Sequence, residues 1–150
     1  MARFEFRVSV DAPPERVFDL WTDLDRAREW LVGLSKITDR TGPVDHPGSS
    51  YVMWFSGRPA PVEVLEVERP RRISSRLKGG LFRGMIGATF DPEADGTRIT
   101  QWSEPEGLGP TIAAWVFSQG SWRGSFRGEL NTFKRIAERE AREANAESKS

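Results

Sequence analysis

The chain offers few side chains that could act as a nucleophile, a general base or a metal ligand. It contains one histidine, His46, and no cysteine, which excludes thiolate nucleophiles, disulfides and cysteine-based metal sites. His46 lies in the Gly/Pro-rich segment 43–48, and Asp45 beside it is badly placed to orient its ring as a general base. We therefore expect an exposed loop histidine, no metal and no cofactor.

Familiar catalytic motifs are missing as well. There is no nucleophile elbow, no P-loop, no dinucleotide fingerprint and no ligand pattern of an iron or iron–sulfur oxygenase. The glycine-rich segment 78–84 lies between two expected strands, which favours a hairpin with a bulge. The charged groups that could still take part in acid–base chemistry are Asp39, Glu63, Glu66, Arg76, Glu104 and Glu106. Strand alternation lets most of them face solvent, so no catalytic residue is assigned.

Aromatic residues are a stronger signal. The chain has six tryptophans and nine phenylalanines, and an indole is awkward as filler because its N–H requires a partner. We predict that a subset of large side chains lines a cavity for an apolar ligand. This subset is Trp30, Met53, Phe55, Phe82, Trp115, Gln119 and Trp122. The alternative is that the same side chains fill the interior and leave no cavity.

The element that would position much of this set runs from Leu108 to about Glu140. Apolar residues recur there at helical spacing on one narrow face, and Pro110 suits a first helical turn. The members of this face are Leu108, Ile112, Trp115, Gln119, Trp122, Phe126, Leu130, Phe133 and Ala137. A single helix of this length would span roughly 40 Å. Gln119 lies between two indoles, which indicates that this face of the helix forms the wall of a cavity. The alternative is that Gln119 lies at the edge of the core.

The rest of the chain predicts mostly strands. Residues 3–10 alternate strictly between apolar and polar, as in a half-buried strand, and helices follow up to Trp21 and over 24–30. Further strands are expected at 35–41, 50–56, 61–69, 72–79, 81–91 and 97–104. In the last of these, Ile99 and Gln101 compete with Trp102 for the inward face, so its inward side is left open. Residues 144–150 read as a solvated tail.

This order predicts an α+β fold in one domain, residues 1–143, with a curved seven-stranded antiparallel sheet around the long C-terminal helix. A curved sheet cannot touch a straight helix along its whole length, so a gap is expected between them.

Charge and hydropathy restrict the partners. Twenty-two basic residues balance 22 acidic ones, so we expect no nucleic-acid binding. No apolar run approaches ~18 residues and the N-terminus has no signal-peptide core. We therefore expect a cytoplasmic protein without membrane insertion.

Five sequence segments resemble the START-type SRPBCC (helix-grip) superfamily, and within it the polyketide cyclase/dehydrase-like branch. They are FEFRVSVDAPPERVFDLWTDLDRAREW at 4–30, PGSSY at 47–51, VLEVERPRRIS at 64–74, DGTRIT at 95–100 and GELNTFKRIAE at 128–138. The resemblance extends over essentially the whole chain, and these are structural segments that carry no reaction. The superfamily includes lipid carriers, hormone receptors, cyclases, chaperone co-activators and oxygenase domains, so fold alone does not decide function.

The resemblance implies a helix-grip fold that binds a hydrophobic small molecule, aromatic or polyketide- or lipid-like, between sheet and helix. The alternative is a polyketide aromatase/cyclase or dehydratase using the same cavity. A protein-interaction module is a third reading.

Glycine spacing raises a separate question of assembly. Gly120, Gly124 and Gly128 recur every four residues on the face of the expected helix opposite the apolar one. Each costs about 1 kcal/mol relative to Ala inside a helix. We hypothesise a smooth ridge that permits a homodimer, with an ordinary solvent face and a monomer as the alternative.

Overall fold

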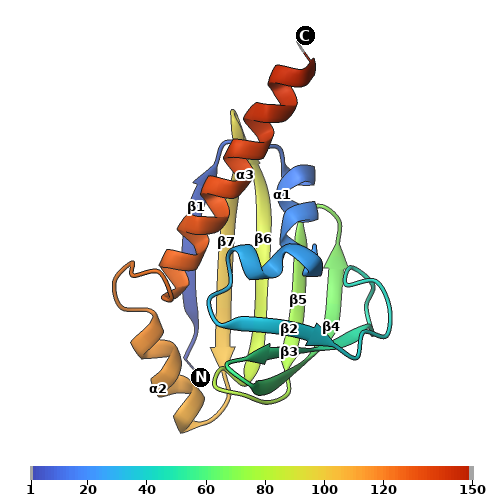
Figure 1. Cartoon of the computed structure of the whole chain (residues 1–150). Coiled ribbons are helices and arrows are strands. Elements are labelled where there is room, and N and C mark those ends of the chain that lie inside the picture. The colour runs from blue at the N-terminus through green and yellow to red at the C-terminus, as the bar shows by residue number, and fades with distance from the viewer. Residues whose placement is uncertain (1, 149–150) are drawn as a thin grey trace.

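The computed structural model describes residues 2–148. Its strands are β1 (Phe4–Val10), β2 (Leu34–Thr38), β3 (Ser50–Phe55), β4 (Arg58–Glu68), β5 (Arg72–Leu77), β6 (Gly84–Glu93) and β7 (Gly96–Pro105). Its helices are α1 (Pro14–Trp21), the short 3₁₀ helix η1 (Leu24–Glu29), α2 (Leu108–Phe117) and α3 (Phe126–Ser148) (Figure 1).

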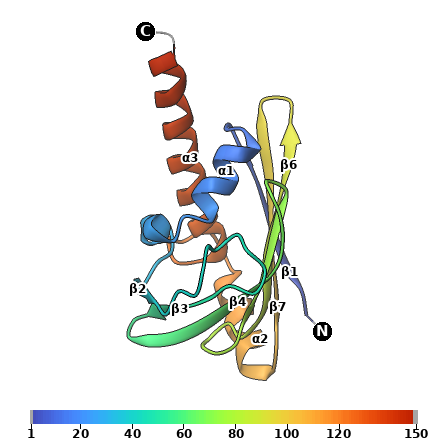
Figure 2. The same cartoon turned by 90° about the vertical axis from the view of Figure 1, so that its right-hand side faces the viewer.

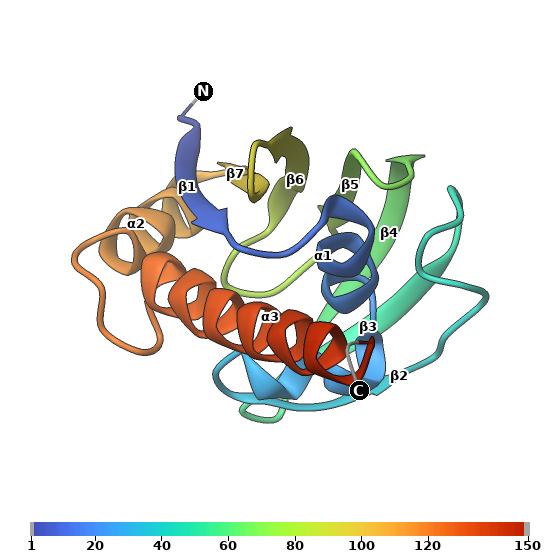
Figure 3. The same cartoon turned by 90° about the horizontal axis from the view of Figure 1, so that it is seen from above.

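All seven strands form one antiparallel sheet in the order β1-β7-β6-β5-β4-β3-β2. The ladder shifts register within β4 and within β2, and such irregularities increase the local bend of a sheet. Figure 2 shows β2 and β3 turned under the helices, while Figure 3 shows α1 and α3 on the same side of the sheet. The predicted α+β fold with a curved seven-stranded sheet and a long C-terminal helix is confirmed.

Strand β7 shows why its sequence was ambiguous. Thr97 and Ile99 are fully buried on the concave face, whereas Trp102 lies on the opposite face and covers Gly87. A Cβ built on Gly87 would come within 2.4 Å of the Trp102 ring, and the Arg3 guanidinium lies 4.6 Å from that ring's centroid. The bulky residue on the outer face is therefore accommodated by a glycine on the neighbouring strand and covered by an arginine.

Aromatic rings pack α1 and α3 against the sheet. Phe133 of α3 is fully buried and meets Trp21 and Trp30 edge-on, with centroids 5.1 and 5.0 Å away. Phe90 of β6 meets Phe18 and Trp21 in the same way at 5.6 Å. Edge-to-face pairs at such distances stabilise beyond their buried area, so this cluster fixes α1 and α3 against the sheet.

The prediction of one helix from 108 to 140 is wrong. Helix α2 ends at Phe117 and α3 begins at Phe126. Gly120 adopts a positive φ of 70°, which interrupts a helix, and the Ser125 hydroxyl accepts the Gly128 N–H at 2.9 Å as an N-cap does. At the other end α3 continues through residues 144–148, which the sequence had assigned to a tail; residues 149–150 lie outside the described residues.

The proposed glycine ridge is also wrong, because Gly120 and Gly124 lie in the connection between the two helices. That connection folds back on α3. A Cβ on Gly124 would lie 2.7 Å from the Trp122 ring, and a Cβ on Gly128 would lie 1.9 Å from the Trp122 carbonyl oxygen. Close approach within the chain explains Gly124 and Gly128, and the positive φ explains Gly120. None of the three gives an argument for a dimer.

Candidate functional site

The hydrophobic interior is divided into two clusters of buried residues. The larger lies under α1 and α3 and includes Phe6, Phe18, Val64, Phe90 and Phe133. The smaller lies at the β2–β4 end and consists of Ala27, Leu34, Met53, Ala60, Val62 and Leu77. Leu31 and Tyr51 pack against both clusters and are themselves only partly buried. We call the region around the Leu31 and Tyr51 side chains the junction.

A carboxylate binds the backbone next to Leu31 in the chain. Glu129, in the first turn of α3, accepts a hydrogen bond of 2.8 Å from the backbone N–H of Val32, which follows Leu31. Burial raises the pKa of Glu129 to about 7, against the lowering effects of the Val32 hydrogen bond and the nearby Arg123 charge. A carboxyl that titrates near neutrality can both release and accept a proton at physiological pH.

Three further polar groups lie on buried surfaces of the same interior. Burial raises the pKa of Tyr51 to about 12, so its phenol is protonated. The Gln101 Oε1 atom on the concave face of β7 and the Trp30 Nε1 atom are buried without a hydrogen-bond partner among residues 2–148. Burying such a group unpaired costs free energy. An acceptor and a donor are thus available to a bound molecule.

Four of the seven side chains predicted to bind a ligand, those of Trp30, Met53, Phe55 and Phe82, belong to this interior. Trp30 is 4% exposed within the larger cluster, and Met53 is 9% exposed within the smaller one. Phe55, on the same face of β3 as Met53, is partly buried and packs against the smaller cluster. The structure therefore places Met53 and Phe55 at the β2–β4 end of the interior, and Trp30 in the larger cluster beside Trp21 and Phe133.

Phe82 packs against aromatic rings of α2 and α3. Its ring lies 5.1 Å from Phe117 of α2 and 5.3 Å from Phe126 of α3, and Phe126 continues to Phe6 of β1 at 5.5 Å. Phe82 also packs against the smaller cluster. These rings connect helix α2 to the interior.

The remaining three predicted residues lie at the surface. Trp115 is 59% exposed and Trp122 is 49% exposed. The Trp122 indole donates to the Gln119 carbonyl oxygen at 2.9 Å, and the Gln119 side chain donates to the Trp115 carbonyl oxygen at 3.1 Å. Because the predicted long helix is broken here, the three residues shape a turn instead of continuing the buried face of α3.

Sequence reasoning missed Tyr51, Gln101 and Glu129. Gln101 had a usable signal, since it shares its strand face with Ile99, and Tyr51 is two residues from Met53 on the same face. Glu129 had none, because its importance depends on Val32, 97 positions away. His46 is exposed in the loop before β3, as expected.

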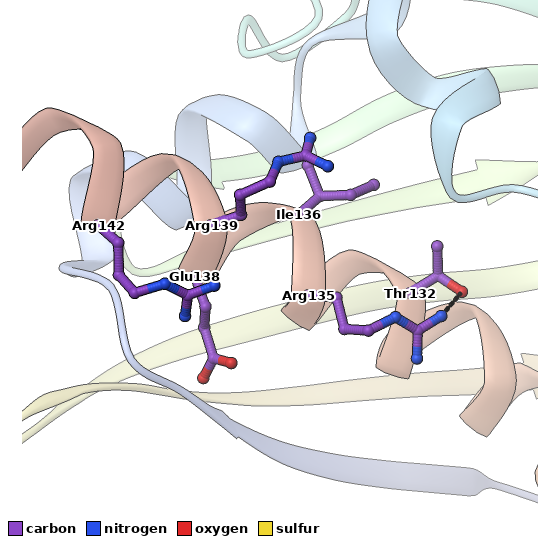
Figure 4. A pocket seen from close by; sticks show the side chains of 6 residues that line it. All are labelled: Thr132, Arg135, Ile136, Glu138, Arg139 and Arg142. Atoms are coloured by element: carbon purple, nitrogen blue, oxygen red, sulfur yellow. Dashed lines mark hydrogen bonds between the residues drawn. The ribbon is translucent and has the colours of Figure 1, made fainter.

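Two pockets lie on the surface of the helices. One, of about 360 Å³, is lined only by residues of α3 and carries Arg135, Arg139 and Arg142 (Figure 4), with Arg135 donating to the Thr132 hydroxyl at 3.3 Å. The other, of about 400 Å³, lies between α1, η1 and α3 and is lined mostly by charged side chains, including Asp19, Arg26 and Glu140. Both are surface depressions with no residue of the sheet.

The sequence of residues 1–142 matches the family model described as polyketide cyclase / dehydrase and lipid transport. The chain belongs to this family. Among curated protein sequences it has no match.

Solved structures agree with the helix-grip fold of the polyketide cyclase/dehydrase and lipid transport family. A Mesorhizobium loti protein matches with a TM-score of 0.72 at 17% identity, covering 92% of this chain and 98% of its own. A Nitrosomonas europaea protein matches with a TM-score of 0.68 at 18% identity, covering 92% and 95%. The Aha1 dimer from Colwellia psychrerythraea gives 0.69 at 15% identity, covering 92% and 97%. At these identities the likeness establishes the fold.

This family membership supports a fold suited to hydrophobic ligands. In residues 2–148 no helix is both long enough and apolar enough to cross a membrane.

Proposed function

We propose that the protein binds a hydrophobic small molecule that is aromatic or polyketide- or lipid-like. The molecule would lie between the sheet and α3, at the junction defined above. The observation that carries this proposal is the division of the interior into two clusters that meet through the partly buried Leu31 and Tyr51. A single well-packed core is the ordinary solution for one domain of this size. A ligand seated at the junction would join the two clusters.

The chemistry of the surrounding groups suggests what such a ligand carries. Apolar side chains, among them Met53 and Phe55, would contact most of its surface, as in typical small-molecule sites. The Gln101 Oε1 atom would accept from a ligand hydroxyl, and the Trp30 N–H would donate to a ligand oxygen. We therefore expect a largely apolar molecule with one or two oxygen functions, such as a phenol or a fatty acid.

Isothermal titration calorimetry with a fatty acid and a polycyclic phenol tests this proposal. Met53→Trp adds bulk at the smaller cluster and should weaken binding about tenfold or more, because overpacking a site costs on the order of 1–3 kcal/mol. Val52→Trp places the same bulk on the opposite face of β3 and serves as the matched control. Equal loss in both variants, or heat of binding from neither ligand, would contradict the proposal.

The second candidate function is an enzyme, an aromatase/cyclase or dehydratase acting at the same place. Glu129 favours it, because a partly buried carboxyl with a pKa of about 7 is matched to proton transfer at neutral pH. An ionised Glu129 would remove a proton from a carbon next to a carbonyl. In this case Glu129→Gln should retain ligand binding and lose product formation, whereas a pure carrier would form no product in either protein.

A further inference from the structure

Helix α2 exposes four large apolar side chains to solvent. Leu108, Ile112, Trp115 and Val116 are 78%, 54%, 59% and 45% exposed, and they share one helical face at positions i, i+4, i+7 and i+8. The opposite face packs on the protein through the buried Ala113 and Ala114 and through Phe117, whose ring contacts Phe82. The four exposed side chains therefore form an unpartnered apolar face.

Two neighbouring side chains extend this face. Leu81, 58% exposed, precedes Phe82, and Trp122, 49% exposed, follows the end of α2. Both are held beside α2, because the rings of Phe82 and Trp122 lie 5.1 and 5.3 Å from Phe117. We call the exposed residues Leu81, Leu108, Ile112, Trp115, Val116 and Trp122 the α2 apolar surface. The segment 107–122 that supplies five of them contains no charged residue.

Positive charge borders both ends of this surface. Arg83 lies at the start of α2, where its guanidinium donates to the Glu106 carbonyl oxygen at 3.2 Å. Arg123 follows Trp122 directly and Arg127 is the second residue of α3; both are exposed. Within residues 2–148, Arg83 and Arg127 form no ion pair.

The acidic side chains nearest the start of α2 are already neutralised. Glu104 is paired with Arg3, and Glu106 is paired with Arg76. Figures 1 and 3 show α2 beside the N-terminal end of α3, at the edge of the molecule. Three guanidinium groups, those of Arg83, Arg123 and Arg127, therefore border the α2 apolar surface, with the Glu129 carboxyl near Arg123.

From this arrangement we propose that α2 docks on an anionic lipid bilayer. The helix lies in the plane of the interface with its exposed leucine, isoleucine and tryptophan side chains among the acyl-chain boundaries, while the arginines contact lipid phosphates. Interfacial helices combine an apolar face with flanking basic residues in this way, and an exposed indole suits the interface because it has an apolar body and a polar N–H.

The sequence predicts no membrane insertion because it lacks the apolar run of ~18 residues that a spanning helix needs. A helix that lies on the membrane surface needs no such run. Docking by α2 involves only surface residues, so its test is independent of the proposed ligand site.

A second copy of the chain fits the same surface less well. In a two-fold dimer the same patch meets itself, so Arg83 and Arg123 of both copies would gather around one apolar contact. Like charges brought together across an interface oppose association. An anionic bilayer supplies the opposite charge.

Co-sedimentation with vesicles tests the proposal. The wild-type protein should sediment with vesicles of equal parts phosphatidylglycerol and phosphatidylcholine, and less with phosphatidylcholine alone or at high salt. The double variant Ile112→Ser with Trp115→Ser should lower vesicle affinity about tenfold or more, because it removes two large apolar groups from the interface. Arg83→Gln with Arg123→Gln should weaken binding to the anionic vesicles while leaving weak binding to neutral vesicles unchanged.

Val32→Ser is the matched control, since Val32 is 42% exposed outside the α2 apolar surface and its loss should leave vesicle binding unchanged. Circular dichroism melting checks that the variants fold. The proposal is overturned if the wild-type protein does not sediment with the anionic vesicles, or if the double variant at 112 and 115 binds as the wild type does. It is equally overturned if sedimentation velocity shows a dimer that this variant dissociates while vesicles are not bound.

Discussion

The Glu129 carboxylate accepts the backbone N–H of Val32 at 2.8 Å, which joins the first turn of α3 to the loop between η1 and β2. A second hydrogen bond holds α3 further along the helix, where Glu138 accepts the Asp11 backbone N–H at 2.8 Å. The helix is therefore held over the sheet by carboxylates bonded to loop backbone on two sides. Only the first of these carboxylates has its pKa raised by burial to about 7.

Replacing Glu129 by Gln should change how stability depends on pH. The folded protein keeps the Glu129 proton up to a pKa of about 7, whereas the unfolded chain loses it near 4.5. The folded state thus binds more protons between these values, and the free energy of unfolding falls as pH rises through them. Because Gln does not ionise and can still accept the Val32 N–H, the melting temperature of E129Q relative to wild type should be higher at pH 8 than at pH 5. A difference that is the same at both pH values would refute the assignment.

Substitution of Gly128 should be severe. Its Cβ would lie 1.9 Å from the Trp122 carbonyl oxygen, so the connection before α3 must move. We expect Gly128→Ala to lower the free energy of unfolding by more than about 2 kcal/mol. Gly79→Ala is the control, since its Cβ would lie 3.5 Å from the Pro61 ring, an ordinary contact, and it should change the free energy of unfolding by less than about 1 kcal/mol. Urea denaturation measures both; similar effects at the two positions would show that the close approach is unimportant.

Gln101→Met separates a structural role from a ligand-binding one. The Gln101 Oε1 atom is buried without a partner, so a side chain of similar shape without that acceptor should raise the melting temperature of the free protein. The same change should weaken binding of a phenol more than binding of a hydrocarbon of similar size. If the melting temperature falls, Gln101 is serving the fold through a contact of its own.

Phe133→Ala tests the aromatic cluster around Phe133. Phe133 is fully buried and meets two indoles edge-on, so its removal should cost about 3–5 kcal/mol of unfolding free energy. Val116→Ala removes a side chain that is 45% exposed and should change stability by less than about 0.5 kcal/mol. Thermal unfolding followed by circular dichroism distinguishes these values. A loss under 1 kcal/mol at Phe133 would mean that the cluster relaxes around the gap.

The order of elements was predictable because each strand has a local sequence pattern. Alternation of Phe6, Val8 and Val10 in β1, and turn residues such as Asp95-Gly96 before β7, depend only on neighbours in the chain. The strand boundaries differ from the predicted ones by a few residues, as expected for frayed ends.

The break between α2 and α3 was not predictable from periodicity, because the apolar spacing continues through it. A positive φ at Gly120 and the Ser125 cap override that pattern. The candidate site was missed for a related reason. The Glu129–Val32 bond and the two-cluster interior arise from contacts between distant segments, which leave no mark in local spacing.

Native mass spectrometry of the freshly purified wild-type protein tests the central proposal most directly. If the junction holds a hydrophobic molecule, the folded protein should carry an additional mass that is released on unfolding and extracts into organic solvent. Met53→Trp should reduce this adduct while Val52→Trp retains it. A wild-type protein that shows only its own mass after gentle desolvation, and that acquires no adduct when fatty acids and polycyclic phenols are added, would contradict it.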